Sequence, residues 1–335
     1  MRSFGGVVAL VVLLAVAVCV ATLFGSDEAS LAAALAGPGK DRTILFVFRL
    51  PRVLLAVVAG AGLAVVGAAF QALLRNPLAE PYVLGVSGGA AVGATTVIAL
   101  GLGTATLLSA ALVPIAALLG GLGATALVYA VARRTPRGPA GASILLAGVM
   151  VNAIAAALIT FGKLLVPPSR AAQMLRWLVG FIELPTTTGL VAVSLYVAAG
   201  CALLMAEAGR MNLLALGDES AETLGVDVTA LERRVFVASS CIVGAIVSLT
   251  GLIGFVGLVV PHAVRRMMGP DHRRLLPLSA LVGATMLVLC DLGSRLAFRA
   301  LGTQLPVGAV TALIGGPVFL VMLTRPSTGA ATTHG

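Results

Sequence analysis

Long apolar runs alternate with short polar connections along nearly the whole chain. A helix that crosses the hydrocarbon core of a bilayer, about 30 Å thick, needs about 20 predominantly apolar residues. Ten runs approach or reach that length, and most of them end at arginine, proline or glycine. We therefore expect ten spans, at residues 7–24, 50–74, 84–102, 107–132, 143–166, 188–205, 235–252, 254–268, 276–296 and 306–323.

The first run and the polar segments define the organisation of the chain. The first run lies where a signal peptide would, but it is longer than a typical apolar core and lacks a convincing cleavage site, so we interpret it as a retained span. Residues 169–184 form a short amphipathic stretch, and residues 207–234 are the longest polar segment. Residues 1–323 thus form one transmembrane domain, and we expect the polar tail, 324–335, to be disordered.

Composition supports the same class. The chain is 59% hydrophobic and only 10% charged, with a mean hydropathy of +1.08, whereas soluble domains carry about 25% charged residues. Water-soluble enzymes, nucleic-acid-binding domains and disordered scaffolds are therefore excluded. The net charge of +9 does not indicate a nucleic-acid partner, because the basic residues are spread over the connections. The sequence predicts an all-α polytopic membrane protein.

Charge in alternate connections predicts the orientation. If both termini are cytoplasmic, the inner side holds 13 of the 22 basic residues, which agrees modestly with the positive-inside rule. The outer side then holds Lys40, Arg42, Arg49, Arg52, Lys163, Arg170, Arg176, Arg295 and Arg299. A weak internal repeat accompanies this topology. A shift of 184 residues places Arg49 on Arg233, Gly60 on Gly244, Gly67 on Gly251 and Pro77 on Pro261, and the two halves would be inverted.

The sequence carries no pattern for catalysis or for its own energy source. The three histidines lack metal-binding spacing, and neither a nucleophile elbow nor a nucleotide-binding P-loop is present. The four cysteines are isolated, so neither disulfides nor a metal site is expected. Asp291 lies near the outer end of its span, four residues before Arg295, which suggests an intrahelical pair. Because coupling ions need carboxylates at mid-membrane, the near absence of such groups disfavours an ion-coupled secondary transporter.

Segment 207–234 is the most suitable attachment point for an external energy source. Two short amphipathic helices, interrupted by glycines, would place leucines beside carboxylates at the membrane surface. This mixture favours a docking surface for a soluble partner. The alternative is a solvated loop that rests on its own bundle.

Ordered blocks from about residue 45 to 323 resemble the FecCD-type permease family of type II ABC importers. These blocks are Arg49-Leu-Pro-Arg52, Gln71-Ala-Leu, Asn76-Pro-Leu-Ala-Glu-Pro81, Leu84-Gly-Val-Ser, Leu145-Leu-Ala-Gly-Val149, Leu214-Ala-Leu-Gly217, Gly254-Phe-Val-Gly-Leu258, Pro261-His262, Asp291 with Arg295, and Leu305-Pro-Val-Gly308. The resemblance implies a ten-span transport subunit, not an enzyme, in the plasma (inner) membrane of a bacterial cell.

The resemblance also implies partners. The permease would pair with a second copy or with a closely similar permease. Two ATPase subunits would dock on the inside and carry ATP and Mg²⁺, while this chain binds no cofactor and no metal. A soluble or lipid-anchored substrate-binding protein would dock on the outside.

Particular residues acquire expected roles from the family. Its outer arginines, which pair with glutamates of the binding protein, match Arg49, Arg52 and Arg295; for the first two, contact with lipid headgroups is the alternative. The expected ATPase contacts are Leu214, Leu216, Gly217, Glu219, Ala221 and Leu224. The expected gate and path residues are Gly141, Ala142, Ser143 and Asn152, although relatives carry more hydroxyl groups at the gate. A hydrogen bond between helices explains Asn152 equally well.

The substrate is the least determined feature. A ferric siderophore is favoured because more members of the family transport iron complexes, and cobalamin or haem is the alternative. The scarcity of histidine, tyrosine and methionine in the spans argues against haem being coordinated in transit.

Overall fold

The computed structural model describes residues 2–102, 107–134 and 140–324, and all its regular elements are helices. The polar tail therefore lies outside the described residues, apart from Thr324. The helices are α1 (Arg2–Leu23), α2 (Leu31–Ala36), α3 (Lys40–Arg42), α4 (Leu50–Leu73), α5 (Val86–Ala99), α6 (Leu107–Arg134), α7 (Ala140–Leu164), α8 (Pro168–Val179), α9 (Thr187–Ala206), α10 (Ala208–Leu214), α11 (Asp218–Thr223), α12 (Val228–Thr250), α13 (Val256–Met268), α14 (His272–Leu301) and α15 (Val307–Thr324).

Each of the ten expected spans contains one helix: α1, α4, α5, α6, α7, α9, α12, α13, α14 or α15. Seven helical segments of the described chain are long and apolar enough to cross a membrane. Helix α5 has 14 residues and is shorter than expected, α13 has 13 and is close to the short span expected at 254–268, and α15 has 18, as expected. At 1.5 Å per residue, α5 and α13 reach only about 20 Å. The polar stretch before α4 is also helical, with a π-helical turn at Thr43–Arg49 that continues directly into α4.

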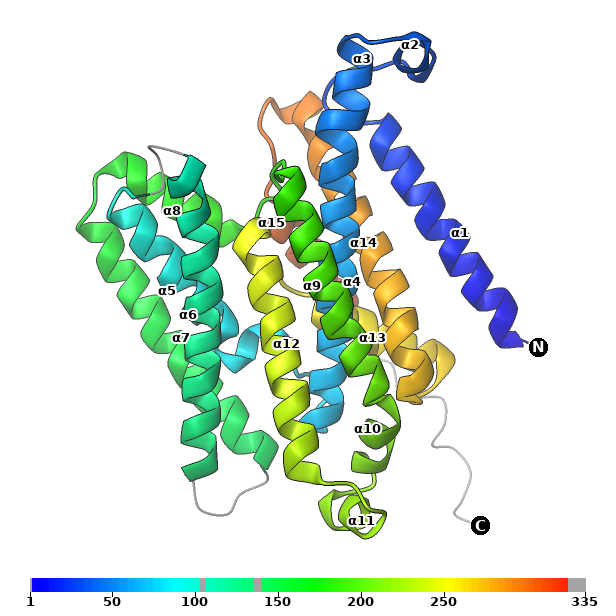
Figure 1. Ribbon diagram of the computed structural model, residues 1–335, viewed down its shortest axis with the longest axis vertical. Coiled ribbons are helices and arrows are strands. Elements are labelled where there is room, and N and C mark those ends of the chain that lie inside the picture. Colours follow the sequence, from blue (N-terminus) through cyan, green and yellow to red (C-terminus); the bar gives the residue numbers. More distant parts are fainter. Residues whose placement is uncertain (1, 103–106, 135–139, 325–335) are drawn as a thin grey trace.

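Figure 1 shows the N-terminal end of α1 at the end of the bundle that carries α10 and α11, whereas α2, α3 and α8 lie at the opposite end. We call these the inner and outer ends, following the predicted orientation. Helix α4 runs from the outer to the inner end, and α12 runs the opposite way (Figure 1).

Two bends interrupt the bundle where α4 leads to α5 and where α12 leads to α13, and they are bonded to each other. Glu80 accepts a hydrogen bond from the Phe255 backbone N–H at 2.7 Å, and the Tyr82 hydroxyl accepts one from the Ile253 N–H at 2.9 Å. The first turn of α13 packs on the middle of α4, where a Cβ on Gly67 would lie 1.8 Å from the Gly257 carbonyl oxygen. Irregular backbone inside a membrane protein needs such internal partners.

The positions of the two bends change the predicted shift in residue number between the two halves of the internal repeat. The order of a long helix, a bend, a short helix and two further helices occurs in α4–α7 and again in α12–α15. The two long helices, α4 and α12, end 177 positions apart, at Leu73 and Thr250. The two short helices, α5 and α13, begin 170 positions apart, at Val86 and Val256. A shift of 184 therefore does not superimpose the two bends, because it places Pro77 of the first bend on Pro261, which lies inside α13.

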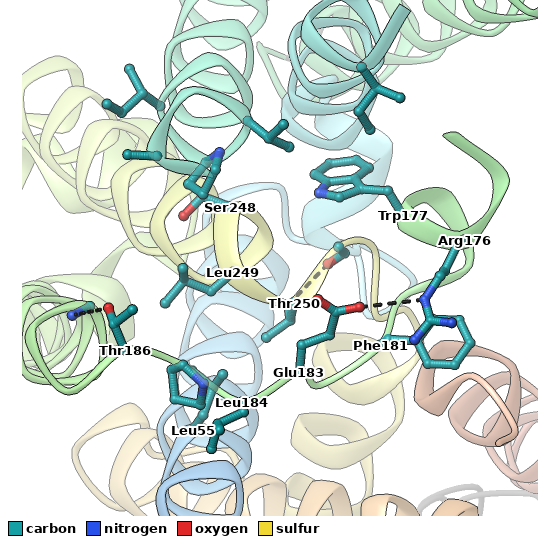
Figure 2. Close-up of a pocket in the computed structure, with 18 of the residues that line it drawn as sticks. Leu55, Arg176, Trp177, Phe181, Glu183, Leu184, Thr186, Ser248, Leu249 and Thr250 are labelled. Atoms are coloured by element: carbon teal, nitrogen blue, oxygen red, sulfur yellow. Dashed lines mark hydrogen bonds and ion pairs between the residues drawn. The ribbon is translucent and has the colours of Figure 1, made fainter. Parts of the chain in front are cut away.

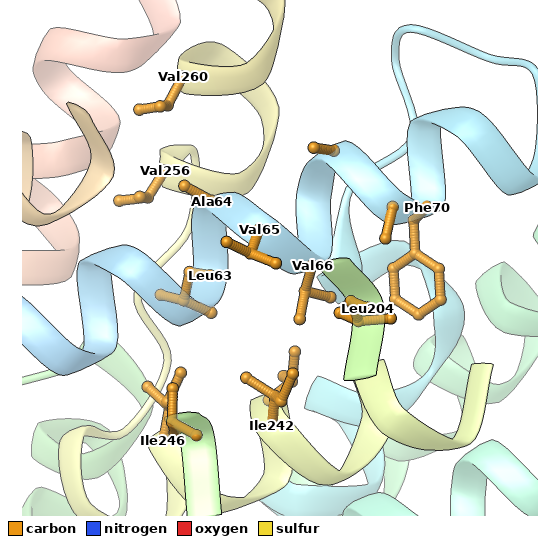
Figure 3. Packing of buried hydrophobic residues seen from close by; sticks show 14 of the residues in the cluster. Leu63, Ala64, Val65, Val66, Phe70, Leu204, Ile242, Ile246, Val256 and Val260 are labelled. Carbon is orange, nitrogen blue, oxygen red and sulfur yellow. The ribbon is translucent and has the colours of Figure 1, made fainter. Parts of the chain in front are cut away.

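The core lies around α4. Figure 3 shows Leu63, Val66 and Phe70 of α4 between side chains of α9, α12 and α13, and these three residues are fully buried. Small residues allow close approach elsewhere on α4. In contrast, α7 exposes an apolar stripe that consists of Leu146, Val149, Met150, Ile154, Leu158 and Phe161.

Candidate functional site

The outer end of the bundle contains a buried cluster of charges. Arg52 lies in the first turn of α4, while Asp291 and Arg295 lie four residues apart on α14. The fully buried Asp291 carboxylate accepts hydrogen bonds from Arg52 Nε and Arg295 Nε, both at 2.9 Å. The expected intrahelical pair of Asp291 and Arg295 is confirmed. Packing of α14 against α4 adds Arg52, across 239 residues of sequence.

Arg49 and Arg295 are only 6% and 5% exposed, because they close the C-terminal end of α1. Arg49 donates to the carbonyl oxygens of Thr22 (3.3 Å), Leu23 (2.7 Å) and Asp27. Arg295 donates to those of Ala21 (2.8 Å) and Phe24 (3.1 Å). The last carbonyls of a helix lack intrahelical partners and carry partial negative charge, so guanidinium groups stabilise them.

Sequence reasoning missed this capping role. The bonded residues lie from 22 to 274 positions apart, so no local pattern could have revealed them. Arg299, which was given no role, also donates to the carbonyl oxygens of Ser26 and Asp27. The arginines thus hold the peripheral helix α1 against α4 and α14.

The three expected docking arginines nevertheless line one small pocket. It has a volume of about 230 Å³ and is lined by Ser26, Asp27, Ile44, Phe48, Arg49, Arg52, Leu184 and Arg295. The side chain of Arg52 is 15% exposed and is the most accessible of the three. The pocket therefore presents concentrated positive charge at the outer end.

A larger cavity of about 710 Å³ lies nearby, between α4, α6, α8, α9 and α12 (Figure 2). Arg176 pairs with Glu183 at 3.4 Å and stacks over the Phe181 ring at 4.7 Å. Trp177 and Thr250 also line the cavity, together with mainly apolar side chains. The amphipathic stretch expected at 169–184 contributes α8 and part of this wall. None of the predicted site residues lines it.

The inner end carries α10 and α11, as two short helices separated by Gly217, whose φ is +112°. Leu216 and Leu224 are 63% and 57% exposed, and Glu219 is exposed beside them. Leu214 and Ala221, in contrast, are fully buried in the chain's own core. The expected coupling residues therefore separate into an exposed set and an anchoring set.

Charged and polar contacts fix this inner segment. Glu207 bonds to Arg210 at 2.6 Å and to Arg234 at 3.1 Å. Burial alone would raise the pKa of Glu207, but the hydrogen bonds and charges of the two arginines outweigh burial and lower the pKa. Asp218 pairs with Arg75 at the inner end of α4.

The expected path residues lie on α7. Gly141 and Ala142 belong to the first turn of α7, where the structure describes only their helical backbone, and Ser143 follows them. Asn152 donates to the Tyr82 carbonyl oxygen at 2.7 Å and accepts from the Gly88 N–H at 3.1 Å. The structure thus shows the alternative expected for Asn152, a bond that joins α7 to the first bend and α5. Within the described chain, no group of histidine, cysteine and acidic residues is placed to hold a metal ion.

Comparison with known proteins identifies the family. Residues 10–325 match the FecCD transport family. The cobalamin import permease of Halobacterium salinarum is 43% identical over 85% of this chain and 74% of its own length. The hemin transport permease of Yersinia pestis is 38% identical over 83% of this chain and 82% of its own length.

A solved structure agrees with this assignment. A metal-chelate type ABC transporter in an inward-facing conformation matches 95% of this chain and 98% of its own, with a TM-score of 0.82 and 29% identity. The expected all-α polytopic fold is confirmed. The chain therefore belongs to the FecCD transport family, and it is the multi-pass membrane permease of an ABC importer rather than a catalytic subunit.

Proposed function

We propose that this permease imports a cobalamin-class chelate. The observation that carries the proposal is the 43% identity to a cobalamin permease over most of the chain. The similar relatives reported above are named for cobalamin and hemin, so the preference for a ferric siderophore, which rested on family frequency, gains no support.

Haem is the second candidate because of the hemin permease relative. Haem iron needs axial ligands such as histidine, methionine, tyrosine or cysteine. His262 is one residue of a ligand type, and its ring packs edge-on against Phe319, with 5.9 Å between the ring centres. A chelate that carries its own metal ligands needs none from side chains along the path, and this favours cobalamin over haem.

At the outer end, we infer that the arginine pocket receives carboxylates of a substrate-binding protein. Arg52 is the accessible guanidinium, and the buried Arg49 and Arg295 add positive potential behind it. Arginine and carboxylate groups form strong bidentate pairs when water is excluded. The attraction between the arginines and the carboxylates also orients the substrate-binding protein as it docks.

At the inner end, the ATPase subunits would dock on segment 207–234. Its exposed Leu216 and Leu224, beside Glu219, form the kind of apolar surface with charged neighbours that marks a protein contact. Leu214 and Ala221 would transmit force to the core rather than contact the partner. ATP and Mg²⁺ would be bound by the ATPase subunits.

The exposed stripe of α7 suits contact with a second copy of the permease, so that the path would lie between the two copies. The first turn of α7, with Gly141, Ala142 and Ser143, would then lie at the inner mouth of the path. Closure of the ATPase pair would rock the bundles and alternate the access.

Uptake by the complete complex in proteoliposomes tests this function. Cobalamin, haem and a ferric siderophore would be offered in parallel, each with its candidate binding protein, with and without ATP. We expect uptake of cobalamin only, abolished when ATP is omitted. Uptake of haem or of the siderophore alone would replace the proposed substrate, and uptake without ATP would overturn the coupling mechanism.

A further inference from the structure

Helices α4 and α14 form a continuous unit between the two ends of the bundle. Near their middle, a Cβ on Gly60 would lie 2.3 Å from the Gly283 carbonyl oxygen, and a Cβ on Gly283 would lie 2.4 Å from that of Gly60. At the outer end, Arg52 of α4 bonds to Asp291 of α14. With 30 residues, α14 is about 45 Å long, enough to connect both membrane surfaces.

One polar side chain of segment 207–234, here called the coupling segment, bonds to the inner end of α14. Asn212 of α10 donates from Nδ2 to Asp271 Oδ1 at 2.7 Å. Its Oδ1 accepts from the His272 backbone N–H at 2.8 Å, and it lies 2.7 Å from the ring Nδ1. Asp271 is the N-cap of α14 and also accepts from the Arg273 N–H. Asn212 therefore bonds to both residues at which α14 begins.

A second contact joins the coupling segment to α4, but it is weaker in kind. Arg75 and Asp218 form an ion pair whose side chains are 40% and 48% exposed. Exposed ion pairs contribute little in water. The contacts of Asn212 with His272, which is only 5% exposed, are partly buried, whereas its bond to Asp271 is exposed. The contacts with His272 are thus better protected than the ion pair.

We propose that Asn212 is the joint through which movement of the coupling segment reaches the α4–α14 unit and, at its other end, the arginine pocket. This inference rests on the proposed function, since it assumes an ATPase at the inner end and a binding protein at the outer end. Asn212 acts as a positioning residue. Binding-protein docking at the pocket would stimulate ATP hydrolysis through this joint.

The test compares ATP hydrolysis by the complete complex in nanodiscs with and without substrate-loaded binding protein. We expect Asn212→Ala to reduce the ratio of stimulated to basal hydrolysis by about 3- to 10-fold. The affinity of the binding protein for the resting complex should stay the same, because the arginine pocket is unaltered. Thr223→Ala is the matched control, since the Thr223 hydroxyl bonds only within its own segment, to the Glu219 carbonyl oxygen at 2.8 Å.

Two variants of Asp271 give an independent test if Asn212→Ala fails to assemble. Asp271→Asn keeps an acceptor oxygen for Asn212 and should retain the stimulation, whereas Asp271→Ala should lose it. An undiminished ratio in Asn212→Ala, or equal ratios in the two Asp271 variants, would overturn the joint while leaving the importer function intact. A wild-type complex with neither stimulation nor uptake would overturn both proposals.

Discussion

Asp291 lies fully buried at the outer end of the bundle, where an isolated carboxylate would be strongly unfavourable. Arg52 and Arg295 neutralise it, and Arg295 simultaneously reaches the end of α1. Because removal of one partner leaves a buried charge uncompensated, charge reversal in this cluster would damage the fold as well as docking. A useful variant must keep Asp291 paired.

Arg52→Gln meets that condition, since Arg295 remains bonded to Asp291. The variant removes the most accessible positive charge of the pocket, so we expect the affinity for the binding protein to fall about tenfold, which corresponds to about 1.4 kcal/mol. Surface plasmon resonance on the reconstituted complex would measure it. Arg176→Gln, outside the pocket in an exposed pair with Glu183, is the control. Equal affinities for the two variants would contradict the docking role of Arg52.

Gly25 tests the capping of α1. A Cβ at this position would lie 2.9 Å from Arg49 Nε and 3.0 Å from Arg295 Nη1. Gly25→Val should displace these guanidinium groups and destabilise the protein by about 1–3 kcal/mol, the usual range for overpacking. Thermal unfolding in detergent would show a lower midpoint than for Gly37→Val, a site with no atom within 4 Å of an added Cβ. Identical midpoints would mean that the arginines adjust freely.

At the scale of helices, the apolar runs predicted where the ten spans lie, because burial in lipid requires long apolar segments. The same runs predicted a short span at 254–268, where α13 lies, but they could not reveal that α5 is short, since bonds between the two bends, such as Glu80 to Phe255, depend on contacts 175 residues apart. The prediction also assigned both the exposed and the buried residues of the coupling segment to contact with the ATPase, because the spacing of leucines alone does not show which face of a helix meets the core.

Gly217 gives the element-scale test of coupling. Its φ of +112° and ψ of +158° lie in a region that is essentially restricted to glycine, at a cost of about 1–3 kcal/mol for alanine, so Gly217→Ala should distort the connection between α10 and α11. We expect more ATP hydrolysed per substrate transported. Gly302 has a φ of +65° at the C-terminal end of α14, and Gly302→Ala therefore strains the backbone outside the segment and far from Asn212. If both variants uncouple transport equally, general strain rather than the coupling segment is responsible.

The ion pairs of Glu207, at the junction of α9 and α10, predict that the stability of the folded protein depends on pH. The lowered pKa of Glu207 means that its ion pairs stabilise the folded protein at neutral pH, and that this contribution is lost as the pH falls through the folded-state pKa. Glu207→Gln should therefore unfold at a lower temperature than the wild type at pH 7. The difference should shrink as the pH falls below the ordinary glutamate pKa of about 4.3, and it should vanish below the lowered folded-state pKa, where the carboxyl group is protonated in both states. A difference that is constant with pH would contradict the electrostatic origin.

At the scale of the whole molecule, several long helices expose apolar side chains, and α7 is one of them. The α7 stripe repeats at three- and four-residue intervals, as expected for one face of a helix. Lipid can cover such a face, and so can a second copy of the permease. A path between two copies requires the second arrangement, and it would lie outside the buried core around α4.

Cysteine cross-linking in native membranes distinguishes these arrangements. In a variant without the four native cysteines, Ile154→Cys or Leu158→Cys on α7 should form disulfide-linked dimers under mild oxidation. Leu195→Cys on α9 is 67% exposed, comparable with 61% for Ile154, and should stay monomeric because α9 would face lipid. If Leu195→Cys forms disulfide-linked dimers and neither α7 variant does, the contact between the copies, and the path with it, lies at the α9 face. Dimers restricted to α7 would support a path between the copies.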